Sequence, residues 1–338
     1  MREGTTATMS TDTATCWVIT DGAAGNERQA VALAEALEVS ARVWRVTPCA
    51  PWSWLAPRLV ASARAALPLV QREGFAPPWP ALAIGCGRIG ALYTRGLRRW
   101  SAGRCFAVQI LNPRIAPAEF DLVVVPRHDG LAGSNVILTL GSLNPVDDAW
   151  LAAGAEAWPG LAALPAPRTA VLIGASHRHV AVDTDYCIGL VERLTALHRQ
   201  TGGSFLVSTS RRTPPALRDW LRSAFARFPG SFWGGDMDGP NPYAGILAQA
   251  DRIVVTPDSV NMLSEACASG RPVYVWLPQP ARGKLGRLHA ALFEAGCLRR
   301  LAEASPPSAV RPRVLRETGA VAAQVRQHWF AARRKAVE

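Results

Sequence analysis

The chain has no run of 18 or more apolar residues, so the sequence predicts no membrane-spanning helix. The first 15 residues, MREGTTATMSTDTAT, lack an apolar segment, and we expect a loose tail there and no secretory signal. The seven cysteines include no C-x-x-C pair, and the six histidines have no metal-ligand spacing with them. Scattered cysteines of this kind are typical of small core residues in a reducing, cytoplasmic compartment, and we expect no metal site.

Lysine is nearly absent, because only Lys284 and Lys335 accompany the arginines among 37 basic residues. Against 26 acidic residues this gives a net charge of +11. A compositional preference for arginine explains much of the excess, and the functional alternatives are nucleic acid, an anionic membrane surface or a phosphorylated ligand. Because the sequence has no zinc-finger, RRM or KH signature, nucleic acid is the weakest of these and is not expected as a partner.

The pattern of elements predicts an α/β protein with two domains. At 338 residues, 49% hydrophobic and 19% charged, the chain is long enough for two cores. Strand-like runs alternate with helical stretches, which favours parallel sheets with right-handed crossovers. The alternation stops in an Ala/Gly/Pro-rich stretch and restarts after Pro167. We therefore expect a first domain over residues 16–150, a linker over 151–168, a second domain over 169–318 with a cleft between them, and a final helix over 319–338 that packs back on the first domain.

One segment, VVTPDSVNMLSEACASGRP, carries the sharpest signals for a site. A β-branched run ends at a Thr-Pro pair, and Asp258 and Ser259 are both good helix N-caps. The next helix then presents free N–H groups, including that of Asn261, at the carboxyl end of a strand, where anions bind in α/β folds. Glu265 lies about 9 Å further along that helix, roughly the step from a diphosphate to its ribose hydroxyls. A solvated helix residue and a simple cap are the ordinary alternatives.

Two glycine-rich turns in the first half are weaker candidates. TDGAAGNERQ places Asp21, Gly22 and Gly25 after the first strand, and glycines there would let a ligand approach the backbone. IGCGRIG adds Arg88 after another strand. Tight-turn glycines and a surface arginine explain the same residues.

Three further segments of the second half carry anion-binding side chains. LIGASHRH offers Gly174 and Ser176, with two histidines and an arginine after them. VSTSRRTP crowds hydroxyls and guanidiniums at a strand end, and a bound anion or water would satisfy them. PQPARGKLGRLH is typical of a basic loop suited to a diphosphate, and equally of an exposed flexible loop. The candidates in the last two segments are Ser210, Arg211, Arg212 and Lys284.

The segment PWSWLAPRLVASARAALPLV interleaves Trp52 and Trp54 with Arg58 and Arg64. Tryptophan beside arginine suits a membrane interface. Buried core aromatics are the commoner explanation and are narrowly favoured. We therefore expect at most a peripheral contact with an anionic membrane surface, without a membrane-spanning helix.

Several of these stretches resemble the mitochondrial-fission/elongated-mitochondria family of GT-B-type glycosyltransferases. They are TDGAAGNERQAVALAEAL, VQILNPR, FDLVVVPRHD, NVILTLGSL, STSRRTP and NPYAGILAQADRIVVTPDSVNMLSEACASGRPVYVW, which together span residues 17–277. The resemblance implies two Rossmann-like domains around a nucleotide-sugar cleft, with the acceptor in the first domain and the donor in the second. It also implies metal-independent, cofactor-free transfer of a sugar from a nucleoside diphosphate to an envelope-type lipid or polysaccharide, at the cytoplasmic face of a membrane.

Within that resemblance the residues take expected roles. The helix that follows TPDS and the arginine-rich turn are expected to bind the diphosphate and the ribose of the donor. The catalytic base is expected to be Asp21, His128 or Asp129. An Asx turn is the structural alternative for Asp21. A nucleotide-sugar epimerase or hydrolase on the same scaffold, and a non-catalytic membrane or protein adaptor, are the alternative functions.

Overall fold

The computed structural model describes residues 16–176, 179–303 and 312–335, and within them the chain forms two compact units. Unit 1 comprises Met1–Val125, Leu131–Leu138 and Thr318–Glu338, and unit 2 comprises Pro126–Gly130 and Thr139–Glu317. The 151–168 stretch, expected as a linker, begins inside a helix of unit 2, α5 (Asp148–Ala157). His177, Arg178 and the expected N-terminal tail lie outside the described residues.

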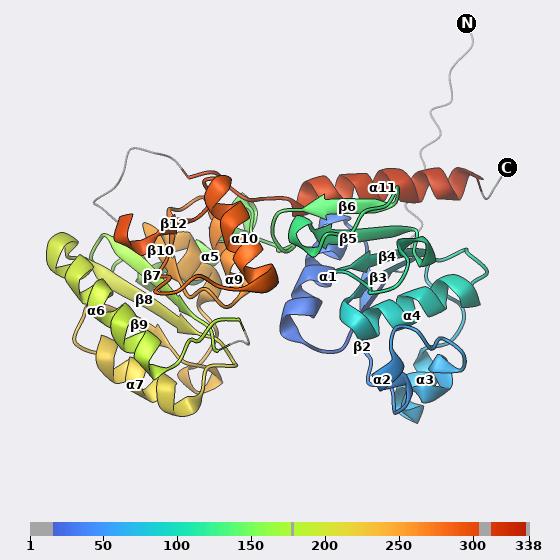
Figure 1. Cartoon of the computed structure of the whole chain (residues 1–338), viewed down its shortest axis with the longest axis horizontal. Coiled ribbons are helices and arrows are strands. Elements are labelled where there is room, and N and C mark those ends of the chain that lie inside the picture. The colour runs from blue at the N-terminus through green and yellow to red at the C-terminus, as the bar shows by residue number, and fades with distance from the viewer. Residues whose placement is uncertain (1–15, 177–178, 304–311, 336–338) are drawn as a thin grey trace, which may run out of the picture. The chain divides into compact units, whose positions relative to one another are not determined.

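Unit 1 is built on a six-stranded sheet of order β2-β1-β3-β4-β5-β6, in which the pairs from β2 to β5 are parallel (Figure 1). Its strands are β1 (Cys16–Thr20), β2 (Ala41–Arg45), β3 (Leu82–Cys86), β4 (Phe106–Ile110), β5 (Leu122–Pro126) and β6 (Val136–Thr139). Its helices are α1 (Ala24–Ala36), α2 (Trp52–Leu55), α3 (Leu69–Gly74), α4 (Gly87–Trp100) and α11 (Thr318–Lys335), with 3-10 turns η1 (Ala63–Ala66) and η2 (Pro117–Glu119).

Unit 2 is built on a second six-stranded sheet, of order β12-β11-β10-β7-β8-β9, with every neighbouring pair parallel. Its strands are β7 (Arg168–Ile173), β8 (Ser204–Thr209), β9 (Gly230–Trp233), β10 (Arg252–Val255), β11 (Val273–Val275) and β12 (Arg299–Arg300). Besides α5, its helices are α6 (Thr184–Thr201), α7 (Pro215–Phe225), α8 (Tyr243–Gln249), α9 (Val260–Ala268) and α10 (Gly283–Glu294), with 3-10 turns η3 (Arg127–Asp129), η4 (Pro159–Leu161), η5 (Asp236–Asp238) and η6 (Leu301–Glu303).

The predicted fold class is confirmed: each unit is a Rossmann-like α/β layer structure. The C-terminal helix α11 packs back on unit 1, where Arg326 donates to the carbonyl oxygens of Ala36 and Leu37 at the end of α1. Among the described residues, no helix is both long and apolar enough to cross a bilayer.

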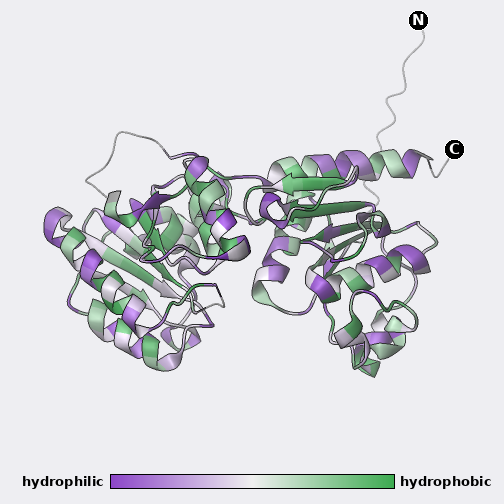
Figure 2. Ribbon diagram, in the orientation of Figure 1, coloured by the Kyte–Doolittle hydropathy of each residue, from purple (hydrophilic) through white to green (hydrophobic). Residues whose placement is uncertain are grey.

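The strands form the apolar centre of each unit, as the hydropathy colouring shows (Figure 2). The strands β1, β3, β4, β5 and β10 are buried along their whole length, which is the pattern of a parallel sheet covered by helices on both faces. In unit 1 an aromatic cluster, comprising Trp17, Trp44, Phe75, Trp79, Tyr93 and Trp100, fills one side of the sheet. Burial of these large rings supplies much of the driving force for folding.

Strand order locates where a ligand would bind. In unit 2 the first strand, β7, lies between β8 and β10, so the chain reverses its direction of travel across the sheet between β7 and β10. This is the strand order of dinucleotide-binding folds, whose ligands bind outside the carboxyl ends of the strands at that reversal. In unit 1 the reversal falls between β1 and β3. The candidate loops TDGAAG, IGCGRIG, LIGAS and TPDS all follow one of these four strands.

Two local expectations are wrong. The basic segment PQPARGKLGRLH is not a loop throughout, because α10 begins at Gly283 and carries Lys284 in its first turn. Trp54 is not a core residue: 75% of its surface is exposed, whereas Trp52 packs partly against the core of unit 1.

Candidate functional site

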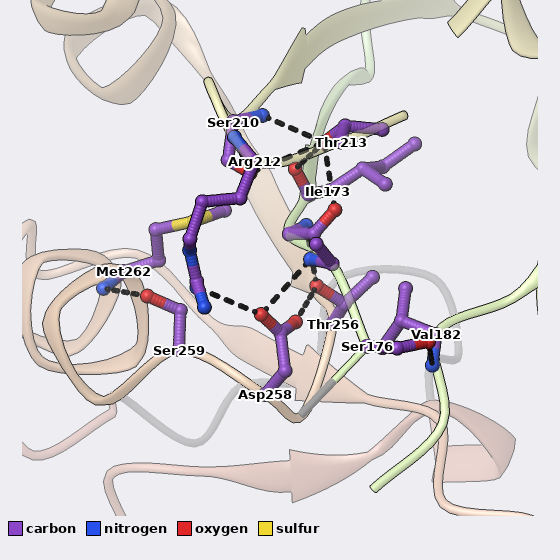
Figure 3. Close-up of polar contacts among 12 residues, drawn as sticks. Ile173, Ser176, Val182, Ser210, Arg212, Thr213, Thr256, Asp258, Ser259 and Met262 are labelled. Atoms are coloured by element: carbon purple, nitrogen blue, oxygen red, sulfur yellow. Dashed lines mark hydrogen bonds and ion pairs between the residues drawn. The ribbon is translucent and has the colours of Figure 1, made fainter. Parts of the chain in front are cut away.

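The turn between β10 and α9 is organised around the buried carboxylate of Asp258 (Figure 3). Its Oδ1 accepts a hydrogen bond from the Thr256 hydroxyl at 2.6 Å. Its Oδ2 accepts from the backbone N–H of Ala175 at 3.0 Å and lies 3.3 Å from the Arg212 guanidinium. Thr256 in turn accepts from the Gly174 N–H at 2.8 Å. Asp258 therefore connects the loops that follow β7 and β10. The helix-cap motif in the sequence does not predict this connection.

Gly174 is required by this arrangement. A Cβ atom at that position would lie 2.1 Å from Asp258 Oδ2, closer than any real contact. The glycine lets the carboxylate pack directly on the backbone at the end of β7, although it has no positive φ to explain it. Ser176 follows it, exposed, and its hydroxyl accepts from the Val182 N–H at 3.0 Å.

The arginine-rich turn after β8 is held by its own hydroxyls. The Thr213 hydroxyl donates to the Gly174 carbonyl at 2.7 Å and accepts from the Ser210 N–H at 3.1 Å. The Ser210 hydroxyl accepts from the Arg212 N–H at 3.2 Å. These bonds fix the turn beside the end of β7 and leave both arginine side chains on its outside, with Arg211 exposed and 56% of the Arg212 side chain exposed.

Helix α9 begins at this edge of the sheet. Its N-cap is Ser259, as predicted, and the Ser259 hydroxyl accepts from the Met262 N–H at 3.4 Å. Asn261 lies half-buried in the first turn. Two backbone N–H groups of that turn, at Val260 and Asn261, have no partner among the described hydrogen bonds, and the positive end of the helix dipole lies with them.

Glu265 lies in the second turn of α9 and is 3% exposed, so the alternative of a solvated helix residue is wrong. Its Oε2 accepts a hydrogen bond from the Tyr243 hydroxyl at 2.6 Å. Tyr243 opens helix α8, 22 residues earlier, and its partnership with Glu265 was not predicted. A buried carboxylate is costly unless it is hydrogen-bonded, and Tyr243 offsets part of that cost.

A buried histidine contacts the backbone of the same turn. His289, on α10, is 3% exposed, and its Nε2 lies 2.9 Å from the Pro257 carbonyl oxygen. Because a carbonyl only accepts, Nε2 carries the proton. Burial lowers the pKa of His289, while the bond to Pro257 raises it by less. The ring is therefore neutral at pH 7 and fixes the backbone between Thr256 and Asp258.

The predicted donor-binding and base residues meet at a second point of unit 2. Lys284 Nζ, on α10, lies 2.7 Å from Asp129 Oδ1 on η3. Arg287 donates to the His128 carbonyl oxygen at 3.0 and 3.2 Å. Burial lowers the pKa of His128, and both cations lower it further while Asp129 raises it. Lys284 is thus engaged by Asp129, which sequence reasoning had assigned to the first domain.

In unit 1 the loops after β1 and β3 lie together. Asp21 is exposed, and its Oδ1 accepts from the Ala23 N–H and from the Asn26 side-chain amide, each at 3.1 Å. The first bond is the Asx turn named as the structural alternative. A Cβ atom at Gly87 would lie 2.6 Å from the same Asn26 amide nitrogen. Glycine is therefore required at position 87, because any side chain there would displace the Asn26 amide that orients Asp21.

The other unit 1 candidates lie nearby. Gly22 has φ +78°, a value that favours glycine, and Gly25 accepts from the Gln29 amide on its carbonyl oxygen at 3.1 Å. Arg88 is exposed and donates to the Trp54 carbonyl at 3.0 Å. Within the described ranges, no three metal-ligating side chains cluster.

The structure therefore brings Gly174, Ser210, Arg212, Asp258 and Ser259 together at the reversal of the unit 2 sheet. Residues that sequence reasoning missed are Thr256, Tyr243, Asn26 and His289. Thr256 precedes Asp258 by two residues, so its role had a local signal. The partners Tyr243 and His289 are each more than 20 residues from the group they bind, and only the fold makes them neighbours.

Comparison with known proteins places this architecture in context. Residues 24–329 match the family model described as Mitochondrial fission ELM1. The chain is 32% identical over 253 residues to Mitochondrial fission protein ELM1 of Arabidopsis thaliana, covering 68% of this chain and 58% of that protein. It therefore spans less than two thirds of that relative's length.

Among solved structures, the fold is similar to a Listeria monocytogenes protein assigned as a UDP-N-acetylglucosamine 2-epimerase, with TM-score 0.56, 11% identity and coverage of 94% and 97% of the two chains. It is also similar to the UDP-GlcNAc 2-epimerase of Methanocaldococcus jannaschii, with TM-score 0.55, 12% identity and coverage of 93% and 99%. At these identities the likeness establishes the fold alone.

Proposed function

This chain belongs to the mitochondrial fission ELM1 family, and we propose that it is a glycosyltransferase that takes its sugar from a nucleoside-diphosphate sugar bound by unit 2. The observation that carries the proposal is the meeting of three loops at the reversal of the unit 2 sheet. They bring the first turn of α9 and the exposed Arg212 guanidinium to one edge, and Glu265 follows in the second turn of the same helix. Fold likeness to proteins named for UDP-sugar chemistry supports the same ligand class.

The leaving diphosphate needs positive charge, and the unit 2 edge supplies it without a metal. The N–H groups of the first turn of α9 and the helix dipole favour an anion there. Arg212 holds Asp258 through one bond at 3.3 Å, and a guanidinium has five N–H donors in all. Its remaining donors, with those of Arg211, are the groups we assign to the phosphates, because charge-assisted hydrogen bonds strengthen as the diphosphate departs.

Glu265 is the proposed ribose contact, and calorimetric titration with UDP, ADP and GDP tests it. Glu265→Ala removes a charged acceptor, so we expect affinity to fall by about 10- to 100-fold, which corresponds to about 1.5–3 kcal/mol. Tyr243→Phe is the matched control, since it removes the 2.6 Å bond to Glu265 but keeps the carboxylate. Unchanged affinity in Glu265→Ala, with the fold intact by circular dichroism, would take Glu265 out of the site.

Asp21 is the proposed catalytic base, because its exposed carboxylate is oriented by Asn26 at the end of β1. His128 and Asp129 rank below it, since their side chains are 9% exposed and Asp129 is paired with Lys284. Asp21→Asn keeps the shape but removes the basicity, so turnover falls by about 100-fold or more while UDP affinity stays constant. Full activity in Asp21→Asn would pass the role to His128.

A nucleotide-sugar epimerase or hydrolase is the second candidate, favoured by the two structural neighbours named as UDP-GlcNAc 2-epimerases. Incubating the protein with a UDP-sugar and no acceptor separates the two. An isomer or free sugar would identify the second candidate, whereas product that appears only when a lipid-linked or polysaccharide acceptor is added supports transfer. If no nucleoside diphosphate binds at all, the remaining interpretation is a non-catalytic adaptor, and the relative that matches this chain is named as a mitochondrial fission protein.

The acceptor and the place of action follow from the same proposal. An envelope-type lipid or glycan acceptor, reached from the cytoplasmic face of a membrane, suits a basic protein of this kind. The assay with a lipid-linked or polysaccharide acceptor tests the proposed acceptor.

A further inference from the structure

Four large apolar side chains of unit 1 are exposed on two short neighbouring helices. They are Trp54 and Leu55 on α2, exposed by 75% and 49%, and Leu69 and Val70 on α3, exposed by 69% and 88%. We call these four residues the α2–α3 surface. Single exposed apolar residues are ordinary, whereas four of them on one small substructure make it a candidate interaction site.

The substructure that carries this surface is tied together. The Cys49 N–H, just before α2, donates to the Ala66 carbonyl just before α3 at 2.9 Å. The Trp52 indole donates to the Ala61 carbonyl at 2.7 Å, and the Gln71 side chain on α3 donates to the Arg45 carbonyl at 2.8 Å. Figure 1 shows α2 and α3 beside each other at one end of unit 1.

The inner side of this substructure is already filled. Val60, Leu67 and Phe75 are each at least 93% buried and belong to the core of unit 1. The four exposed side chains therefore have no room to fold inward. They stay at the surface because the core beneath them is complete, which is the arrangement of a docking surface.

The charge around the surface is mostly positive. Residues 41–75 contain five arginines and a single acidic residue, Glu73. Arg58 is exposed directly after α2, and Arg88 donates to the Trp54 carbonyl at 3.0 Å. A Cβ atom at Gly74, the last residue of α3, would lie 3.1 Å from the Arg42 guanidinium, so a third arginine adjoins the other helix. Apolar side chains among arginines match a bilayer interface with anionic headgroups.

We propose that the α2–α3 surface docks unit 1 on an anionic lipid bilayer. Trp54, Leu55, Leu69 and Val70 enter the headgroup–acyl boundary, and the arginines around them contact the phosphates and carboxylates of the lipids. With four and six residues, α2 and α3 are too short to span a bilayer, so the contact is peripheral. The inference is independent of the proposed enzymatic activity, since it rests on residues that the donor site does not use.

Sedimentation of the full chain with vesicles tests this surface. Binding to vesicles with 30% phosphatidylserine is expected, with much weaker binding to pure phosphatidylcholine, and binding should fall as salt rises because the charge term is screened. Trp54→Ser and Arg58→Glu should each reduce binding by about tenfold. The matched controls in unit 2, Met237→Ser (100% exposed) and Arg199→Glu (exposed), should bind as the parent chain does.

A fluorophore reports the docking site directly. Cys49 is exposed and the other six cysteines are buried, so an environment-sensitive maleimide dye labels the chain just before α2. Its emission should rise and shift to the blue with anionic vesicles and stay unchanged with neutral ones. Equal binding to both vesicle types, absence of binding, or equal losses in the Met237 and Trp54 variants would each overturn the proposal. A purified protein that binds this surface while vesicles do not would assign it to a protein partner instead.

Discussion

At the level of single residues, the most informative group is the Asp258 carboxylate. The sequence indicated a helix cap beside an anion site, and the cap is Ser259. Asp258 instead accepts bonds from Thr256 and Ala175 and pairs with Arg212, with none of its side chain exposed. It is a cross-link between two strand ends, and in the proposed donor site the groups that it positions, not its own oxygens, would contact the ligand.

Asp258→Asn is therefore expected to destabilise the fold. An amide in place of the carboxylate presents an N–H₂ group to at least one donor, Thr256 or Ala175, and weakens the contact with Arg212. Leaving a buried partner unsatisfied costs about 1–3 kcal/mol. Urea unfolding measures the change, and Asp219→Asn, an exposed change on α7, is the control with an expected effect within about 0.5 kcal/mol. Equal unfolding free energies for both variants would contradict the cross-link.

The local signals at this site were readable because they involve neighbours in sequence. The Thr-Pro stop, the Ser259 cap and the polar turn at 210–213 all come from residues within a few positions of one another. Long-range partners were not readable, since the sequence pattern does not state that Tyr243 contacts Glu265 or that Lys284 contacts Asp129. Packing of α8, α9 and α10 around the sheet creates those pairs.

At the level of elements, His289 on α10 makes the stability of the folded chain depend on pH. The folded-state pKa of His289 lies below its ordinary value of 6.5, because burial disfavours the charged ring. Below about pH 6.5 the unfolded chain therefore binds more protons than the folded chain at this residue. The stability that the neutral ring contributes is fully present above that pH and is lost as pH falls toward the folded-state pKa.

Measuring the unfolding free energy between pH 7.5 and 5 tests this dependence. The parent chain should lose stability as pH falls, with His289 contributing at most about 1.4 kcal/mol per pH unit. His289→Gln keeps a donor for the Pro257 carbonyl but does not titrate, so its slope should be smaller. His128→Asn should reduce the slope as well, because burial also lowers the pKa of His128. A slope in His289→Gln equal to the parent's would remove His289 from the account.

Helix α11 offers a second test on the scale of an element. Its buried positions, Val321, Ala322, Val325 and Trp329, form one stripe at helical spacing and pack it on unit 1. Trp329 is 4% exposed, whereas the adjacent Phe330 is 47% exposed. Trp329→Ala should therefore cost about 3–5 kcal/mol of stability and Phe330→Ala much less. Thermal unfolding measures both, and equal shifts would mean that α11 is not anchored through this stripe.

On the scale of the whole molecule, the strand–helix alternation was enough to predict two parallel α/β units. Buried strands such as β5 read as continuous apolar runs, whereas the two-residue strand β12, which consists of two arginines, carries no such signal. Short helices were harder. The helices α2, α3 and α8 have too few residues to show a period, and α5 lies in the Ala/Gly/Pro-rich stretch that indicated a linker.

The same division into units makes the donor proposal testable on the intact chain by hydrogen exchange. If unit 2 binds the nucleoside diphosphate, UDP at saturating concentration should slow amide exchange in peptides that contain residues 210–213 and 258–261, because bound phosphates engage the N–H groups of Val260 and Asn261 and shield the arginine-rich turn from solvent. It should also raise the unfolding midpoint, since a ligand that binds only the native state stabilises it by about 2.7 kcal/mol at 100 times Kd.

The loop at residues 20–26 in unit 1 is the internal reference and should exchange at its ligand-free rate. Arg212→Ala should abolish most of the protection in unit 2 at the same UDP concentration, whereas Arg199→Glu, an exposed change in the last turn of α6, should leave it unchanged. Protection confined to unit 1, or none in either unit, would show that the three strand-end loops of unit 2 do not form a diphosphate site.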